Sequence, residues 1–142
     1  MTTFVLGADT VHSTAALCDY LDGLVDADDR VVAVNSHPGG DETTSEDLRD
    51  GEDALNVTAT RLAAVCDVES HQFVRGNDPA TDLLEAVEAE DADELVIGVR
   101  ERTPAAKVVF GSTAQEVLLR SNVPVRVVPL ETVEVTPLRS SR

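Results

Sequence analysis

The residues of this sequence best suited to bind a ligand lie in the segment 97–115. Within it, Gly111, Ser112 and Thr113 open a predicted helix. The first turn of a helix leaves backbone N–H groups without partners, so a glycine followed by two hydroxyls is typical of a phosphate site. Earlier in the segment, Gly98 ends an apolar run and would let a ligand approach the backbone closely.

The same segment is positively charged in a chain that is otherwise acidic. It contains three cations and one acid, namely Arg100, Arg102, Lys107 and Glu101. A basic island of this kind favours an anionic ligand, because the rest of the surface would repel one. Solvated loop cations and a plain glycine–serine helix cap would give the same pattern, so these residues alone leave a phosphate site and a simple loop both open.

Short apolar runs alternate with helical patterns along the chain. The runs that predict strands cover residues 3–8, 30–37, 69–76, 93–99 and 123–129. Between them we expect helices, with Ser13 as cap of the first, Asp78 and Pro79 opening the third, and the last over residues 112–121. This alternation predicts an α/β fold: a single domain with a five-stranded, mostly parallel sheet and helices on both faces.

Open parallel sheets bind ligands at the carboxyl ends of their strands. In this sequence Asp9 follows the first strand, Val34 lies at the end of the second and Gly98 at the end of the fourth. The irregular connection from Gly98 to Gly111 is longer than the usual run of about 2–6 residues, which is typical of a functional loop. A second connection, residues 38–53, is polar and acidic and shows no apolar periodicity.

The composition restricts the partners of the protein. Twenty-seven acidic and eleven basic residues give a net charge of −16, and such a surface repels nucleic acids and anionic membranes. The acids are scattered and Lys107 is the only lysine, which favours adaptation to high salt over an acidic interaction protein. No apolar run reaches 18 residues and no signal peptide is recognisable, so we expect a cytoplasmic protein that does not span a membrane.

Cysteine and histidine do not predict a metal site. Cys18 and Cys66 each lie in a helical pattern without a CxxC motif, so we expect buried core thiols. His12, His37 and His71 are far apart in the sequence and are expected to be ordinary surface or loop histidines.

The glycines of the loop match a known motif. The chain resembles the universal stress protein family, whose nucleotide-binding members carry G-x-x-G, nine residues and then G-[S/T]. Here Gly98 is the first glycine, residues 102–110 are the nine, and Gly111-Ser112 closes the motif, whereas Glu101 replaces the second glycine. The stretches LGAD, RGNDPA, ADELVIG and VPVRVVP also resemble the family.

The resemblance covers residues 3–129 and implies a fold and a role. Residues 1–142 would form one universal-stress-protein-like domain, Rossmann-like and of the adenine-nucleotide-binding type, with 130–142 as a C-terminal extension or tail. The family resemblance implies a regulatory module of the stress response that forms a homodimer through the last strand, residues 123–129. Against this, Arg126 could act as a charge that keeps the edge strand unpaired.

The resemblance to ATP-binding relatives also implies the ligand and its contacts. Asp9 and the backbone of Val34 would contact the adenosine. The ribose and phosphates would lie against Ile97, Gly98, Gly111, Ser112 and Thr113. Arg100 would offset the charge that Glu101 places beside the phosphates. The expected ligand is ATP or another adenine nucleotide, accompanied by Mg²⁺.

Other functions stay open at this point. Because Glu101 replaces a motif glycine, the alternative is a dimeric interaction module that binds no nucleotide and has a degenerate pocket. The GxSxG, Walker A and HEXXH motifs are absent from the sequence, so we expect no dedicated enzyme and at most slow ATP hydrolysis. A flavodoxin-like fold with a different ligand would leave the long positive loop unexplained.

Overall fold

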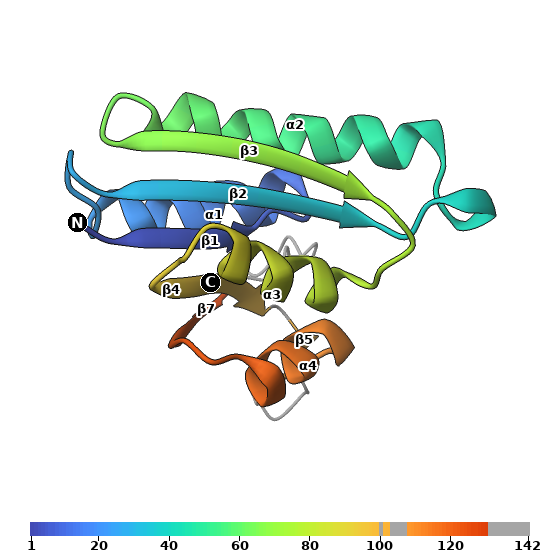
Figure 1. Ribbon diagram of the computed structural model, residues 1–142. Helices are drawn as coiled ribbons and strands as arrows, with labels where there is room; N and C mark the ends of the chain where they lie inside the picture. Colours follow the sequence, from blue (N-terminus) through green and yellow to red (C-terminus); the bar gives the residue numbers. More distant parts are fainter. Residues whose placement is uncertain (100, 103–107, 131–142) are drawn as a thin grey trace, which may run out of the picture.

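The central sheet of the computed structural model has five parallel strands in the order β3-β2-β1-β4-β7 (Figure 1). The structure describes residues 1–99, 101–102 and 108–130. The strands are β1 (Thr3–Gly7), β2 (Arg30–His37), β3 (Asp67–Val74), β4 (Glu94–Val99) and β7 (Val125–Pro129). This architecture confirms the predicted α/β fold and places β1 beside β4 at its centre.

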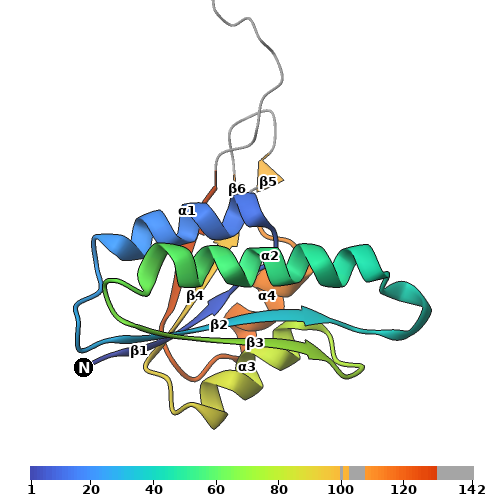
Figure 2. The same ribbon diagram turned by 90° about the horizontal axis from the view of Figure 1, so that it is seen from above.

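Helices cover both faces of the sheet. They are α1 (Val11–Asp22), α2 (Ser45–Leu62), α3 (Pro79–Ala89) and α4 (Ser112–Arg120). Figure 2 shows α1 and α2 on one face and α3 on the other, where α4 packs beside it. Side chains alternate along each strand, so Leu6 belongs to the core under α1 and α2, and Val5 to the core under α3 and α4. Within the described ranges, none of the helices combines the length and apolar character needed to cross a bilayer.

The polar segment 38–53, predicted as a connection, is largely helical. It contains a 3-10 turn at Gly40–Glu42 and the first turns of α2. Thr44 caps α2, because its hydroxyl accepts the Asp47 N–H at 3.0 Å while the Asp47 carboxylate accepts the Thr44 N–H at 2.9 Å. The prediction was wrong because this part of the helix has no apolar periodicity and is started by a local polar motif.

The first and third helices begin at side-chain caps. Helix α1 is capped by Thr10 and not by Ser13, which is its third residue: the Thr10 hydroxyl accepts the Ser13 N–H at 3.0 Å and the Ser13 hydroxyl accepts the Thr10 N–H at 3.2 Å. Helix α3 begins as predicted, because the Asp78 carboxylate accepts the Thr81 N–H at 2.8 Å and Pro79 is its first residue.

The long connection between β4 and α4 contains a short antiparallel pair, β5 (Glu101–Arg102) and β6 (Val108–Val109). It is therefore not irregular throughout, as the sequence had suggested. Arg100 and Lys107 lie outside the described residues. The third strand, predicted at residues 69–76, begins and ends two residues earlier, and Gly76 lies beyond it with a positive φ of 82°.

Candidate functional site

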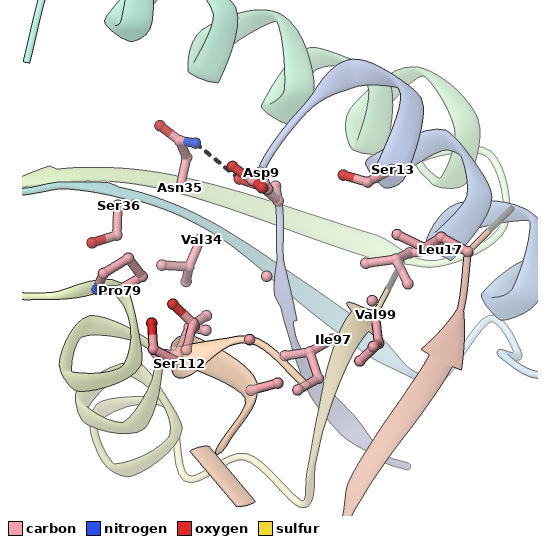
Figure 3. A pocket seen from close by; sticks show the side chains of 18 residues that line it. Asp9, Ser13, Leu17, Val34, Asn35, Ser36, Pro79, Ile97, Val99 and Ser112 are labelled. Atoms are coloured by element: carbon pink, nitrogen blue, oxygen red, sulfur yellow. Dashed lines mark hydrogen bonds between the residues drawn. The ribbon is translucent and has the colours of Figure 1, made fainter. Parts of the chain in front are cut away.

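A pocket of about 450 Å³ opens at the carboxyl ends of β1, β2 and β4. It lies where the order of the strands reverses, since β2 and β3 lie on one side of β1 whereas β4 and β7 lie on the other. Residues of α1 line it from one face of the sheet and the first residues of α3 and α4 from the other (Figure 3). This is the position at which open parallel sheets bind ligands.

The fold brings most of the predicted site residues together around this pocket. Those that line it are Asp9, Val34, Ile97, Gly98, Gly111, Ser112 and Thr113. They come from four separate segments of the chain, which meet only because parallel strands end at the same edge of the sheet. Arg100, the remaining predicted residue, lies outside the described residues. The contacts of these residues with a ligand stay a prediction.

The N-terminus of α4 faces the pocket with its backbone. Gly111 is the N-cap residue and has no side chain with which to cap the helix. Its backbone is extended, with φ −71° and ψ 176°, and a Cβ at this position would meet open space, so packing does not require a glycine. The first turn contains no acid, and Ser112 is exposed. This helix end therefore keeps the positive partial charge that attracts anions.

Asn35 also lines the pocket, although the sequence analysis did not predict a contact between this residue and a ligand. Its side chain is buried, and its amide nitrogen donates to the Ala8 carbonyl at 2.8 Å (Figure 3). Its amide oxygen accepts from Nε2 of Gln72 at 3.0 Å. The carbonyl of Val34, expected to meet the adenosine, already accepts the Ala8 N–H at 2.8 Å. These bonds hold the ends of β1, β2 and β3 in register.

A glycine in α2 makes this arrangement possible. A Cβ at Gly51 would lie 2.1 Å from Oδ1 of Asn35 and 2.8 Å from Nε2 of Gln72. Gln72 also donates to the Leu48 carbonyl at 2.9 Å, which ties β3 to the same helix. Glycine usually destabilises a helix interior, but here only a residue without a side chain lets α2 approach the buried amide.

Gly98 has a packing role that differs from the expected one. A Cβ at Gly98 would lie 2.7 Å from Cδ1 of Leu130, whose N–H donates to the Val99 carbonyl at 2.7 Å. Leu130, the first residue of the predicted C-terminal extension or tail, lines the pocket and is buried. The space left by the missing side chain of Gly98 is therefore filled by Leu130, and the approach of a ligand at Gly98 stays a prediction.

A buried carboxylate lies behind one wall of the pocket, and sequence reasoning assigned it no role. The side chain of Asp82 is fully buried and accepts from the Ser36 hydroxyl at 2.5 Å, from Nε of Arg75 at 2.9 Å and from the Asn77 amide at 2.9 Å. Burial by itself raises the pKa of Asp82, but the three hydrogen bonds together hold it below its ordinary value. The sequence did contain a sign of this buried acid: Asp82 lies four residues before Ala86 and therefore on the same, inward face of α3.

Away from the pocket, Glu69, His71 and Glu90 form an ionic cluster that the sequence did not predict. Their ligand atoms lie within 4.8 Å of one another. The guanidinium of Arg30, the first residue of β2, donates to Glu90 and, at 2.5 Å, to Glu69, and it lowers the pKa of Glu69. Because Arg30 already donates to both carboxylates, the cluster serves as an ion-pair network that joins β2, β3 and the end of α3.

Known proteins share this sequence pattern and this fold. The sequence model of the universal stress protein family matches residues 11–129. A universal stress protein from Mycolicibacterium smegmatis is 35% identical over 85 residues, a match that covers 53% of this chain and 65% of the relative. The universal stress protein from Archaeoglobus fulgidus has a solved structure that is 28% identical with a TM-score of 0.68, and the match covers 89% of this chain and 98% of that one.

A second solved structure, that of the universal stress protein from Archaeoglobus fulgidus in complex with dAMP, is 25% identical with a TM-score of 0.62. This match covers 89% of this chain and 97% of that one. The match to the curated Mycolicibacterium relative spans just under two thirds of its length. The family model, by contrast, covers the strands and helices from α1 to β7. The chain therefore belongs to the universal stress protein family.

Proposed function

We propose that this chain is a stress-response regulatory module that binds an adenine nucleotide of the ATP type, accompanied by Mg²⁺, in the pocket at the ends of β1, β2 and β4. The observation that carries the proposal is the N-terminus of α4, which borders the pocket with a glycine in place of a side-chain cap. The relative solved in complex with dAMP supports an adenine nucleotide as the ligand.

The two ends of the pocket suit the two ends of a nucleotide. The phosphates would lie at α4, where the backbone N–H groups of the first turn and the hydroxyls of Ser112 and Thr113 can donate to them. The base and ribose would lie among Asp9, Val34 and Ile97, which line the pocket beyond the helix. A volume of about 450 Å³ falls within the range of about 300–1,000 Å³ for small-molecule sites.

A second candidate function is favoured by Leu130. Its side chain packs onto Gly98, where the resemblance places the ribose. Leu130 then occupies the space in which the ribose would lie, and the chain would serve as a dimeric interaction module without a nucleotide. Glu101, at a glycine position of the motif, favours the same alternative, because a carboxylate near the phosphates would repel them.

Direct analysis of bound nucleotide separates the two functions. The full chain would be purified in high salt, denatured and filtered, and the filtrate examined by absorbance and mass spectrometry. Nucleotide-free protein would then be titrated with ATP, ADP and AMP, with and without Mg²⁺, by calorimetry. We expect one adenine nucleotide per chain and a melting temperature that rises with ligand concentration. Folded protein that releases and binds no nucleotide would overturn the proposal in favour of the interaction module.

We also propose that the chain forms a homodimer through the last strand, residues 123–129. Among the described strands, β7 lies at the edge of the sheet and pairs only with β4, so its other side suits a partner strand. The charge of Arg126 does not prevent a partner strand from binding there, because its guanidinium forms an ion pair with Glu94 and donates to the Tyr20 hydroxyl at 2.8 Å. Light scattering of the full chain should give twice the mass of one chain, and a single chain mass would contradict the dimer.

A further inference from the structure

The hydroxyl of Ser36, which lines the pocket, can act only as a hydrogen-bond acceptor toward a ligand. Ser36 lies on β2, lines the pocket and is half-buried there (Figure 3). Its hydroxyl donates to Oδ2 of Asp82 at 2.5 Å. A serine hydroxyl has one hydrogen and two lone pairs, so once the hydrogen is used the oxygen can only accept a further hydrogen bond. Toward a ligand, Ser36 is therefore an acceptor.

The surroundings of Asp82 keep this polarity in place. Its other oxygen, Oδ1, accepts from Nε of Arg75 and from the Asn77 amide, both at 2.9 Å. Arg75 is itself held by the ring of Phe73, 3.9 Å from its guanidinium carbon, and by Glu85 at 3.0 Å. An ionised carboxylate has no hydrogen to donate, so the shared hydrogen must come from Ser36. The direction in which the pKa of Asp82 is shifted agrees with an ionised group.

We propose that Ser36, oriented by the buried carboxylate of Asp82, selects nucleotides whose base presents an amino group and rejects those that present a keto oxygen. This inference rests on the proposed nucleotide function and names a specificity-determining residue for it. Adenine can donate its exocyclic amino hydrogen to the Ser36 oxygen. Hypoxanthine, which carries a keto oxygen at the same position, would place two acceptors against each other, and neither would gain a hydrogen bond.

The same polarity also sets the direction of the ligand. The Ser36 oxygen presents only lone pairs to the pocket, and the buried carboxylate of Asp82 lies behind it, so an anion at Ser36 is disfavoured. The N-terminus of α4, with no acid in its first turn, favours an anion at Gly111. The phosphates are therefore expected at α4, which attracts an anion, and not at Ser36, which disfavours one, and this leaves the end of β2 to the base.

Calorimetric titration of the full chain with AMP and with IMP tests the inference, since the two differ at the group in question. We expect wild-type protein to bind AMP at least about tenfold more tightly than IMP. Equal affinities in the wild type would overturn the role of Ser36 while leaving the nucleotide function intact. If neither nucleotide nor ATP binds to folded protein, the proposed function fails and the inference fails with it.

Two substitutions change the hydrogen bonding at Ser36 in different ways. Ser36→Ala removes the acceptor, so the preference for AMP should fall to within about threefold while IMP binding is not weakened. Asp82→Asn can keep its oxygen toward Arg75 and Asn77 and turn its amide toward Ser36, which frees the serine hydrogen for the ligand. The preference should then shift toward IMP.

Asn77→Ala is the matched control, because it removes a hydrogen bond to Asp82 but leaves the bond between Ser36 and Asp82. It should retain the AMP preference of the wild type. If Asp82→Asn does not fold, Ser36→Ala still decides, since Asp82 keeps its bonds to Arg75 and Asn77 when the Ser36 hydroxyl is removed. An unchanged AMP to IMP ratio in folded Ser36→Ala would overturn the inference.

Discussion

The N-termini of α3 and α4 both border the pocket, through Pro79 and Gly111. Their N-cap backbones are alike, with φ and ψ of −75° and 163° at Asp78 and −71° and 176° at Gly111. In α3, however, the Asp78 carboxylate accepts the Thr81 N–H at 2.8 Å, and proline has no N–H to offer. In α4, Gly111 leaves the corresponding backbone groups to other partners.

The two helix ends differ in charge as well. The first turn of α3 contains the buried Asp82, whereas the first turn of α4 contains no acid. A helix N-terminus attracts an anion only while its N–H groups and its partial charge are not satisfied from within. The comparison shows that two helix ends with the same backbone geometry can differ, because the side chain at the N-cap decides whether an N–H group of the first turn already has a partner.

The largest effect is expected from making α4 resemble α3. Gly111→Asp should weaken ATP binding at least about a hundredfold, because the carboxylate would both cap the N–H groups and repel the phosphates. The fold should tolerate it, since a Cβ at position 111 meets open space and aspartate is a better N-cap than glycine. Calorimetry and thermal unfolding should thus show lost binding with an equal or higher melting temperature.

Gly111→Asn separates charge from capping in this experiment. The asparagine side chain can cap the helix but carries no charge, so its affinity for ATP should lie between those of the wild type and Gly111→Asp. Wild-type affinity in Gly111→Asp would show that the phosphates do not lie at α4.

A smaller effect is expected from removing the cap of α3. Asp78→Ala should lower the free energy of unfolding by about 1 kcal/mol, since it leaves the Thr81 N–H without its acceptor. This corresponds to a melting temperature lower by about 3 °C. The affinity for ATP should change less than about threefold. Urea unfolding and calorimetry would check both results, and a large loss of affinity would show that α3 also contributes to phosphate binding.

The smallest effect is the pH dependence of that cap. The hydrogen bond from the Thr81 backbone holds the pKa of Asp78 below its ordinary value. A folded pKa below the unfolded one gives stability that is present above the unfolded pKa, about 3.9, and is lost as the pH falls through the folded pKa. The difference in unfolding free energy between wild type and Asp78→Ala should therefore stay constant from about pH 8 to pH 5 and shrink below about pH 4. A constant difference down to pH 2 would contradict this origin.

Much of the fold could be predicted because its signals are local. The strand Arg30–His37 follows from a run of valines, and the start of α3 follows from Asp78 and Pro79. The beginning of α2 could not be found in the same way. Its cap at Thr44 lies in a polar stretch, and the position of the helix depends on Gly51, which packs onto a buried amide of β2.

In the candidate site, too, some residues could be predicted from local sequence and others could not. Gly98 and Gly111 were found from the motif, and both line the pocket. The sequence places Asn35 at the end of the second strand, but its hydrogen bonds could not be predicted, and neither could the position of Leu130, because both depend on contacts with another strand or helix.

The sequence by itself determined the order of the main strands and helices, the cap of α3 and the chemistry of the glycine motif, because these depend on residues that are close together in the chain. Only the tertiary structure decided which side chains line the pocket and which partners hold them. It placed Ser36 against Asp82, 46 residues away, and Asn35 against Gln72, 37 residues away. It also placed Leu130 in the space left by Gly98. A hydroxyl becomes an acceptor and a glycine becomes a packing site only through partners that the folded sheet brings together.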